Sequence, residues 1–99
     1  MKRMTKQAMI IDGNSVDGYL VETADIVSIP GGYTGDAIEK LAKFENFYDD
    51  LIKGQETLAE ELALLRSEGK EKSVQFKELL TKKLVNVNMK ILLKNYGLE

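Results

Sequence analysis

The sequence contains neither cysteine nor histidine. Without cysteine, the chain forms no disulfide and has no thiolate nucleophile or thiolate metal ligand. Without histidine, it lacks the side chain that most often serves as a general base and as a metal ligand. The serines therefore have no imidazole to activate them. These absences argue against an enzyme, and we expect no catalytic residue, no cofactor and no metal site.

Tryptophan is absent as well, phenylalanine and tyrosine together number seven, and there is a single proline. So few large aromatic side chains give a 99-residue monomer only a thin core, for which self-association is a common remedy. No apolar run is long enough to span a bilayer, and residues 1–11 lack the apolar centre of a secretion signal. We therefore expect no membrane partner and a cytoplasmic location.

What the sequence does contain is one long apolar stripe in its middle third. The spacing of four and three residues is that of a coiled-coil heptad, and it predicts a helix over residues 36–68. Such a face needs a partner, so we expect a homo-oligomer, with a dimer favoured. The predicted oligomer interface comprises Leu41, Phe44, Tyr48, Leu51, Gln55, Leu58, Leu62 and Leu65. In a monomer, the same stripe would instead pack on the C-terminal helices of its own chain.

The sequence also indicates where this helix begins and whether it is continuous. Either Thr34 or Asp36 is expected to be the N-cap, with Glu39 completing a start that resembles a capping box. Gly54 disfavours the helix by about 1 kcal/mol relative to alanine. A kink or break there is the alternative, but the heptad phase continues unchanged, so we predict continuity. Gln55 either fixes the register or number of associated helices, or marks a local defect where a partner element enters.

Residues 1–35 are predicted to form a β-rich N-terminal arm. Met1–Gln7 is short, basic and polar, and we interpret it as a flexible lead-in. Ala8–Ile11 and Tyr19–Ile29 are strand candidates, the second with a break near Ala24-Asp25. The turn residues between them predict a β-hairpin with a long loop. A lone hairpin is marginal in water, so it needs a helix or another copy to pack on.

Two glycine-containing motifs in this arm are interpreted as structural. Asp12-Gly13-Asn14 suggests a calcium loop, but Val16 and Asp17 stand where an EF-hand needs an oxygen ligand and a glycine. We interpret it as a turn. Pro30-Gly31-Gly32 lacks the longer glycine pattern and the Lys-Ser/Thr of a phosphate-binding loop. We predict a hinge there, between the arm and the helix.

Residues 69–99 are predicted to form a helical C-terminal unit. The polar segment 67–72 interrupts the apolar stripe and indicates a loop or hairpin turn, the alternative being one very long helix with a polar patch. Residues 74–84 are again predicted to be helical. One face of that helix carries Phe76, Leu80 and Leu84, and Leu79 adjoins it.

Two asparagines interrupt the pattern further on. Asparagine is a poor interior helix residue and a good cap, so we predict a kink or short turn over residues 85–88. Asn88 would then open a final helix that ends at Asn95. A strand over the alternating residues 85–91 is the alternative. The end of the chain is predicted to be a helix stop, with Gly97 left-handed and Leu98 folded back on Leu93.

Charge is divided unevenly along the chain. The net charge is −1 for residues 1–35, −4 for 36–67 and +3 for 68–99, which gives −2 in total. Opposite charge favours contact between the central helix and the tail, within one chain or between chains.

The basic tail is also a candidate nucleic-acid interface. Two helices around Asn86 would resemble a helix-turn-helix, with residues 89–95 as the reading helix. The lysines concerned are Lys70, Lys72, Lys77, Lys82, Lys83, Lys90 and Lys94. Arginine, the residue most used to read guanine, does not occur in this region. The alternative is that these lysines keep the helices solvated and complement the acidic helix.

The C-terminal third carries the pattern Gly-Lys-x-Lys…Phe…Lys-Leu…Tyr-Gly, which runs from Leu65 through Gly69-Lys70-Glu71-Lys72 and Phe76 to Tyr96-Gly97-Leu98. This pattern resembles the tails of small uncharacterised proteins of phages and prophages of Gram-positive bacteria. The resemblance implies a phage origin, in the host cytoplasm or in a virion, and it implies no activity and no functional residue.

Taken together, these patterns predict a mainly α protein with a β-rich arm, a long coiled-coil helix and a basic helical unit. We expect a non-enzymatic oligomerisation or adaptor protein that acts through protein–protein contacts, as a virion component or a binder of a host factor. Nucleic-acid binding through the lysines is the alternative.

Overall fold

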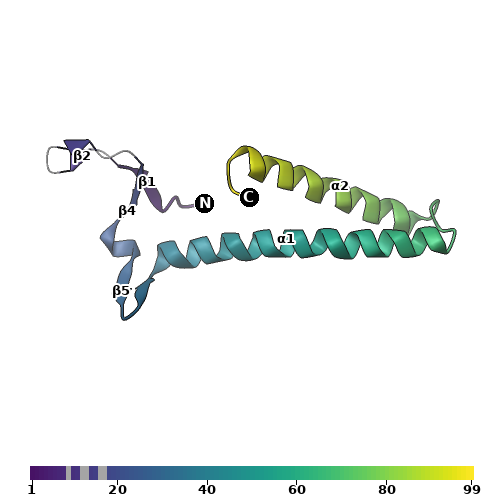
Figure 1. Cartoon of the computed structure of the whole chain (residues 1–99), viewed down its shortest axis with the longest axis horizontal. Coiled ribbons are helices and arrows are strands. Elements are labelled where there is room, and N and C mark those ends of the chain that lie inside the picture. Colours follow the sequence, from purple (N-terminus) through teal and green to yellow (C-terminus); the bar gives the residue numbers. More distant parts are fainter. Residues whose placement is uncertain (9, 12–13, 16–17) are drawn as a thin grey trace. The chain divides into compact units, whose positions relative to one another are not determined.

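The computed structural model describes residues 1–8, 10–11, 14–15 and 18–99. It divides the chain into two compact units, residues 1–45 and 46–99, so the boundary lies inside the long helix. Figure 1 shows the elements of each unit. The fold is mainly helical, as predicted, with short strands confined to the first unit.

Among its described residues, the N-terminal unit contains three separate two-stranded antiparallel sheets. β1 (Thr5–Gln7) pairs with β4 (Tyr19–Val21), and β2 (Ile10–Ile11) pairs with β3 (Asn14–Ser15). The interpretation of residues 1–7 as a flexible lead-in is wrong for residues 5–7. A strand forms there because the backbone of residues 5–7 finds a partner in residues 19–21.

The strand candidate that begins at Tyr19 is interrupted where the sequence indicates. A 3₁₀ turn, η1 (Thr23–Asp25), separates β4 from β5 (Val27–Ile29), which confirms the break. The structure does not describe Met9, Asp12-Gly13 or Val16-Asp17, so the turn predicted around Asp12-Gly13-Asn14 lies mainly outside the described residues.

Pro30-Gly31 is a hairpin turn rather than a hinge. It joins β5 to β6 (Gly32–Thr34), and Ile29 pairs directly with Gly32 across the two-residue loop. Proline fixes its own φ near −65°, and Gly31 takes a φ of 89°, which suits the third position of a type II turn. The same two residues that suggested flexibility therefore build a defined reversal.

The long helix α1 (Asp36–Ser67) begins after Gly35. The amide of Glu39 donates to the carbonyl of Gly35 at 3.0 Å, so Gly35 is the N-cap, and neither Thr34 nor Asp36 has that role. Gly35 has a φ of 123°, and a β-carbon there would lie 2.6 Å from the backbone oxygen of Asp25. Only glycine fits at this position without displacing the backbone of the 3₁₀ turn.

α1 continues through Gly54 without a break, as predicted. It spans 32 residues, which is about 48 Å at 1.5 Å per residue. It ends in a Schellman motif, in which the amide of Lys70 donates to the carbonyl of Leu65 at 2.8 Å and Gly69 takes a φ of 70°. The hairpin turn predicted after Ser67 is therefore confirmed.

The second helix, α2 (Val74–Asn95), is uninterrupted, and the kink predicted at residues 85–88 is wrong. Its capping interactions lie at the two ends instead. The Ser73 hydroxyl accepts a hydrogen bond from the Phe76 amide at 3.1 Å, and the Leu98 amide donates to the Leu93 carbonyl at 2.9 Å, beside a left-handed Gly97. With both ends capped, interior asparagines add only a few tenths of a kcal/mol of unfavourable propensity.

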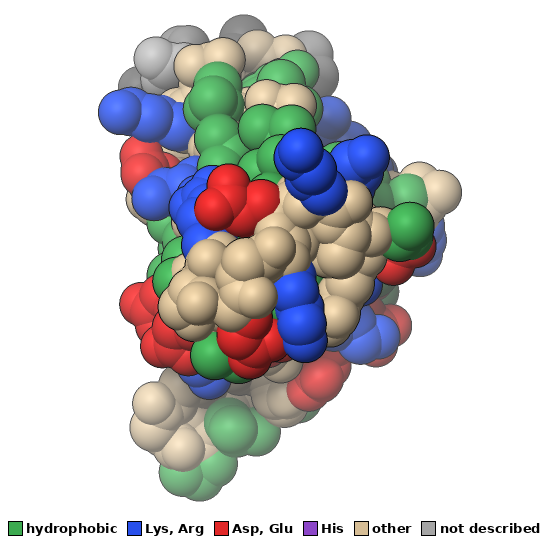
Figure 2. Space-filling view, turned by 90° about the vertical axis from the view of Figure 1, so that its right-hand side faces the viewer, with side chains coloured by type: hydrophobic (Ala, Val, Ile, Leu, Met, Phe, Trp, Pro, Cys, Tyr) green, Lys and Arg blue, Asp and Glu red, His purple; other side chains and the backbone are tan. Residues whose placement is uncertain are grey.

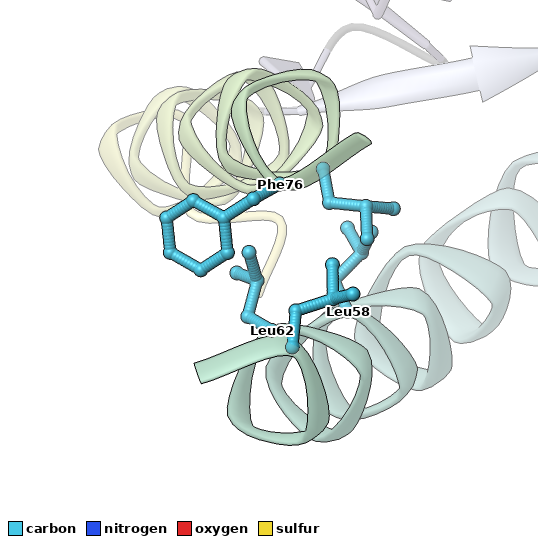
Figure 3. Close-up of a cluster of buried hydrophobic side chains, with 5 residues drawn as sticks. Leu58, Leu62 and Phe76 are labelled. Carbon is cyan, nitrogen blue, oxygen red and sulfur yellow. The ribbon is translucent and has the colours of Figure 1, made fainter. Parts of the chain in front are cut away.

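Within the second unit, α2 runs back along the second half of α1 to form an antiparallel helical hairpin (Figure 1). The core lies near the connection. Leu58 and Leu62 point from α1 toward Phe76 on α2, as Figure 3 shows. Leu62 is only 1% exposed. The whole cluster comprises Leu58, Leu62, Leu65, Phe76 and Leu79, with Leu80 packed against its edge.

Candidate interaction surface

The heptad stripe of α1 divides into a covered part and an open part. Leu58, Leu62 and Leu65 belong to the buried cluster with α2 of the same chain, and Leu51 is also buried. These four side chains are not available to a second copy, and the prediction that they form an oligomer interface does not describe this structure. The remaining predicted positions are partly or fully accessible: Leu41 is exposed, and Phe44, Tyr48 and Gln55 are half-buried.

The face that α2 turns toward α1 changes character along its length. Near the connection it carries the buried Phe76 and Leu79. Further along, the positions on that face are Lys83, Asn86 and Lys90, all half-buried. Gly54 on α1 lies opposite Asn86 on α2, because a β-carbon on Gly54 would lie 3.5 Å from the Asn86 side-chain nitrogen.

The apolar face predicted for residues 74–84 is therefore buried only in part, through Phe76 and the adjoining Leu79. Leu79 is buried in place of Leu84, which is 57% exposed. Leu80 is half-buried at the edge of the cluster. Leu80, Leu84, Val87 and Ile91 follow one another at intervals of four, three and four, which places them on one face of a helix. We call these four residues the α2 stripe, and Val87 and Ile91 are 36% and 51% exposed.

Sequence reasoning missed the α2 stripe because it placed a break at residues 85–88. The heptad spacing of these four residues was the available signal. It becomes visible once the helix is known to continue through both asparagines.

The lysines proposed to contact nucleic acid are distributed over several faces of α2 and its connection. Lys70, Lys72, Lys77, Lys82 and Lys94 are exposed, and Lys70 forms an ion pair with Glu68 at 2.8 Å. Figure 2 looks onto the connection, where basic and acidic side chains gather together. Lys77 and Lys82 line a shallow depression together with the acidic Glu78. The charged surface is thus mixed, with no continuous basic stripe.

The N-terminal unit offers apolar side chains but little core. Ala8 is the one buried side chain among the residues of this unit whose burial is described. Tyr19 and Tyr33 are 68% and 63% exposed. The hairpin of β5 and β6 also exposes Val27 and Ile29. Three two-stranded sheets with so little buried surface are marginal by themselves.

One ion pair crosses the β1–β4 sheet. The Lys6 ammonium donates to the Glu22 carboxylate, and both side chains are largely exposed. This hydrogen bond, with the attraction between the opposite charges, holds the pKa of Glu22 below its ordinary value and raises the pKa of Lys6. On an exposed surface the pair contributes little to stability.

Neither a metal-binding cluster nor a membrane-spanning helix occurs in the part of the chain that the structure describes. Its acidic residues form no group of three or more that could hold a metal ion, and neither of its helices is long and apolar enough to cross a membrane. The features of interest are therefore surfaces, above all the α2 stripe. No protein-family model, curated protein or solved structure matches the sequence.

Proposed function

We propose that this chain is a non-enzymatic oligomerisation and adaptor protein of phage type, acting through protein–protein contacts as a virion component or a binder of a host factor. The phage assignment is supported by the resemblance of the C-terminal third to phage and prophage proteins. The oligomerisation assignment is supported above all by one observation, the exposed α2 stripe.

Burial explains why the α2 stripe favours association. Leu84 and Ile91 are each more than half exposed, although both sit inside a capped helix that is already packed on α1. Burying a leucine or isoleucine side chain contributes about 1.5–3 kcal/mol. A row of such side chains on one helix face is typical of a surface that a partner covers.

The N-terminal unit supports the same proposal. Its exposed Tyr33, Val27 and Ile29 lie on a two-stranded sheet whose outer edges are free of strand partners among the described residues. A partner that packs on such a sheet or pairs with its edge would supply the burial that the unit lacks.

A mass measurement in solution tests the self-association on which the proposal depends. The chain has a mass of 11.1 kDa, and we expect light scattering after size exclusion to give at least twice that value at micromolar concentrations. A mass of one chain at every concentration up to about 1 mM, which corresponds to a binding free energy weaker than about −4 kcal/mol, would refute self-association.

A second candidate, nucleic-acid binding, is favoured by one observation, the five exposed lysines of the C-terminal third. Binding through phosphates would weaken steeply as salt is added. A gel-shift series at salt concentrations from about 50 to about 200 mM would show that slope. The absence of a shift at the lowest salt would exclude this candidate.

A further inference from the structure

The α2 stripe has a counterpart on α1. The residues that α2 turns toward α1 are Leu79, Lys83, Asn86 and Lys90. Each residue of the α2 stripe directly follows one of these four in the sequence. On α1, Leu51 and Leu58 are buried and Gly54 meets Asn86, and the same helix face continues at position 47. The same step from these four positions reaches the α1 stripe, which we define as Tyr48, Ile52, Gln55 and Ala59. Both stripes have spacings of four, three and four.

Both stripes lie on the same side of the helical hairpin. One residue turns a helix by about 100°, so each stripe is rotated by about a right angle from the face that meets the other helix. A two-fold axis perpendicular to the plane that contains both helix axes exchanges two antiparallel helices. Because this operation keeps both helices right-handed, a step of one residue turns toward the same side of that plane on each of them. Equal steps on α1 and α2 therefore lead to one shared surface.

This shared surface, which we call the uncharged face, consists of the α1 stripe and the α2 stripe. None of its eight residues is charged. Seven of the eight side chains are apolar or aromatic, and Gln55 is the exception. On the opposite side of the hairpin, one position before the inward residues, stand the charged side chains of Asp50, Glu61 and Lys82.

The two stripes have the same length and the same position along the hairpin. Each covers twelve positions, about 16 Å of helix. The contact between Gly54 and Asn86 lies at the middle of both, because residues 48–59 and 80–91 are centred there. The uncharged face thus consists of two apolar rows of equal length on neighbouring antiparallel helices, which diverge with distance from their connection (Figure 1). Two such rows on an antiparallel helix pair are the surface with which one half of a four-helix bundle packs on the other.

We propose that a second copy of this chain covers the uncharged face, so that two hairpins form a four-helix bundle with α1 of each copy over α2 of the other. This inference rests on the proposed self-association and adds its surface and its arrangement. The buried layers would contain Ile52 with Leu84 and Val87, and Gln55 near the centre.

Charge selects this arrangement over the one that places α1 over α1. The residues that directly follow those of the α1 stripe form the outer edge of α1, the side turned away from α2. They are Asp49, Lys53, Glu56 and Glu60, with a net charge of −2. Two such edges would repel each other. The same step on α2 reaches Thr81, Val85, Asn88 and Leu92, none of which is charged, so placing α1 over α2 of the partner keeps the two acidic edges apart. The two-fold axis then runs along the helices, with both connections at one end.

Two matched pairs of variants test the surface. Leu84 and Leu92 lie on the same helix and are 57% and 58% exposed, but only Leu84 belongs to the uncharged face. We expect Leu84→Glu to weaken the dimer by about 100-fold or more, because it buries one unpaired carboxylate from each copy. Leu92→Glu should leave the mass unchanged. Val87→Glu and Met89→Glu, at 36% and 38% exposure, form the second pair with the same expectation.

Circular dichroism shows whether each variant keeps its helices. A third pair repeats the test on α1, where Ala59 and Thr57 are both exposed: Ala59→Glu is the test and Thr57→Glu is its control. If the wild-type chain is a dimer and Leu84→Glu and Val87→Glu leave its mass unchanged, the uncharged face is not the interface, although the proposed self-association stands. If the wild-type chain is a monomer, the proposed self-association itself fails.

The arrangement of the two copies is tested with a spin label. The chain contains no cysteine, so Glu71→Cys in the connection gives a single labelled site in each copy. With both connections at one end, the label separation is on the order of 20 Å, about twice the distance between packed helix axes. With α1 over α1, the labels lie at opposite ends, on the order of 50 Å apart at 1.5 Å per residue. A distance near the larger value overturns the proposed arrangement.

Discussion

Replacing Leu62 with alanine should remove the centre of the hairpin core. Leu62 is 1% exposed and lies among Leu58, Leu65, Phe76 and Leu79. Leucine-to-alanine changes in cores cost about 2–5 kcal/mol, depending on how far the surroundings collapse into the space left. Here the neighbours form the edges of a cluster between only two helices, so they can relax. We expect the lower half of that range, about 2–3 kcal/mol.

Leu64 provides the control, because it lies two residues away on the same helix and is 59% exposed. Leu64→Ala should change the free energy of unfolding by less than about 0.5 kcal/mol. Urea unfolding followed by the helical signal at 222 nm measures both variants, at one protein concentration so that association affects them equally. A slope of about 1–3 kcal/mol per molar urea converts the expected loss into a midpoint shift of about 0.7–3 M. Equal shifts for Leu62→Ala and Leu64→Ala would refute the assignment of the core.

Three further predictions concern a helix position, a turn and an ion pair. Gly54→Ala should stabilise the helices by up to about 1 kcal/mol in the same urea experiment, because its β-carbon would meet Asn86 at an ordinary 3.5 Å; a loss of stability would show that the helices approach more closely. Gly35→Ala should disorder the turn at Asp25 by NMR, whereas Gly32→Ala, which has open space around it, should not; equal spectra would contradict the close approach. Lys6→Ala should raise the pKa of Glu22 toward its ordinary value, as an NMR titration of the carboxyl would show. Because that pKa is lowered in the folded chain, the small stabilisation from this pair is present above the ordinary Glu pKa and is lost as the pH falls through the lowered one.

The ends of the helices could be predicted where local chemistry decides them. Gly97 was identified as a left-handed stop, and the structure gives it a φ of 75° with the expected bond from Leu98 to Leu93. The continuity of α1 through Gly54 was predicted because the heptad phase does not shift there. In each case the deciding interactions lie within a few residues along the chain.

Tertiary contacts decided the features that sequence reasoning missed. Gly35, rather than Thr34 or Asp36, caps α1 because a β-carbon at residue 35 would collide with the backbone of Asp25, which no local pattern reveals. Thr5–Gln7 is a strand because residues 19–21 lie beside it. The asparagines at 86 and 88 suggested a break, but α2 packs along α1 and is capped at both ends, which outweighs their weak propensity.

The orientation of α2 about its own axis links the fold to the proposed assembly. A rotation of about 100° would turn Leu84, Val87 and Ile91 toward α1 and release the half-buried Lys83 and Lys90 to solvent. That rotation would take Leu79 out of the core, but it would bury three aliphatic side chains in its place, so a hairpin that buried apolar surface only within one chain would gain from it. The observed orientation instead leaves the α2 stripe beside the α1 stripe, on the one side of the hairpin whose middle carries no charge. The apolar burial that a single chain forgoes is recovered if a second copy covers both stripes at once. The comparison of Leu84→Glu with Leu92→Glu therefore tests the reason for the orientation of α2 as well as the assembly.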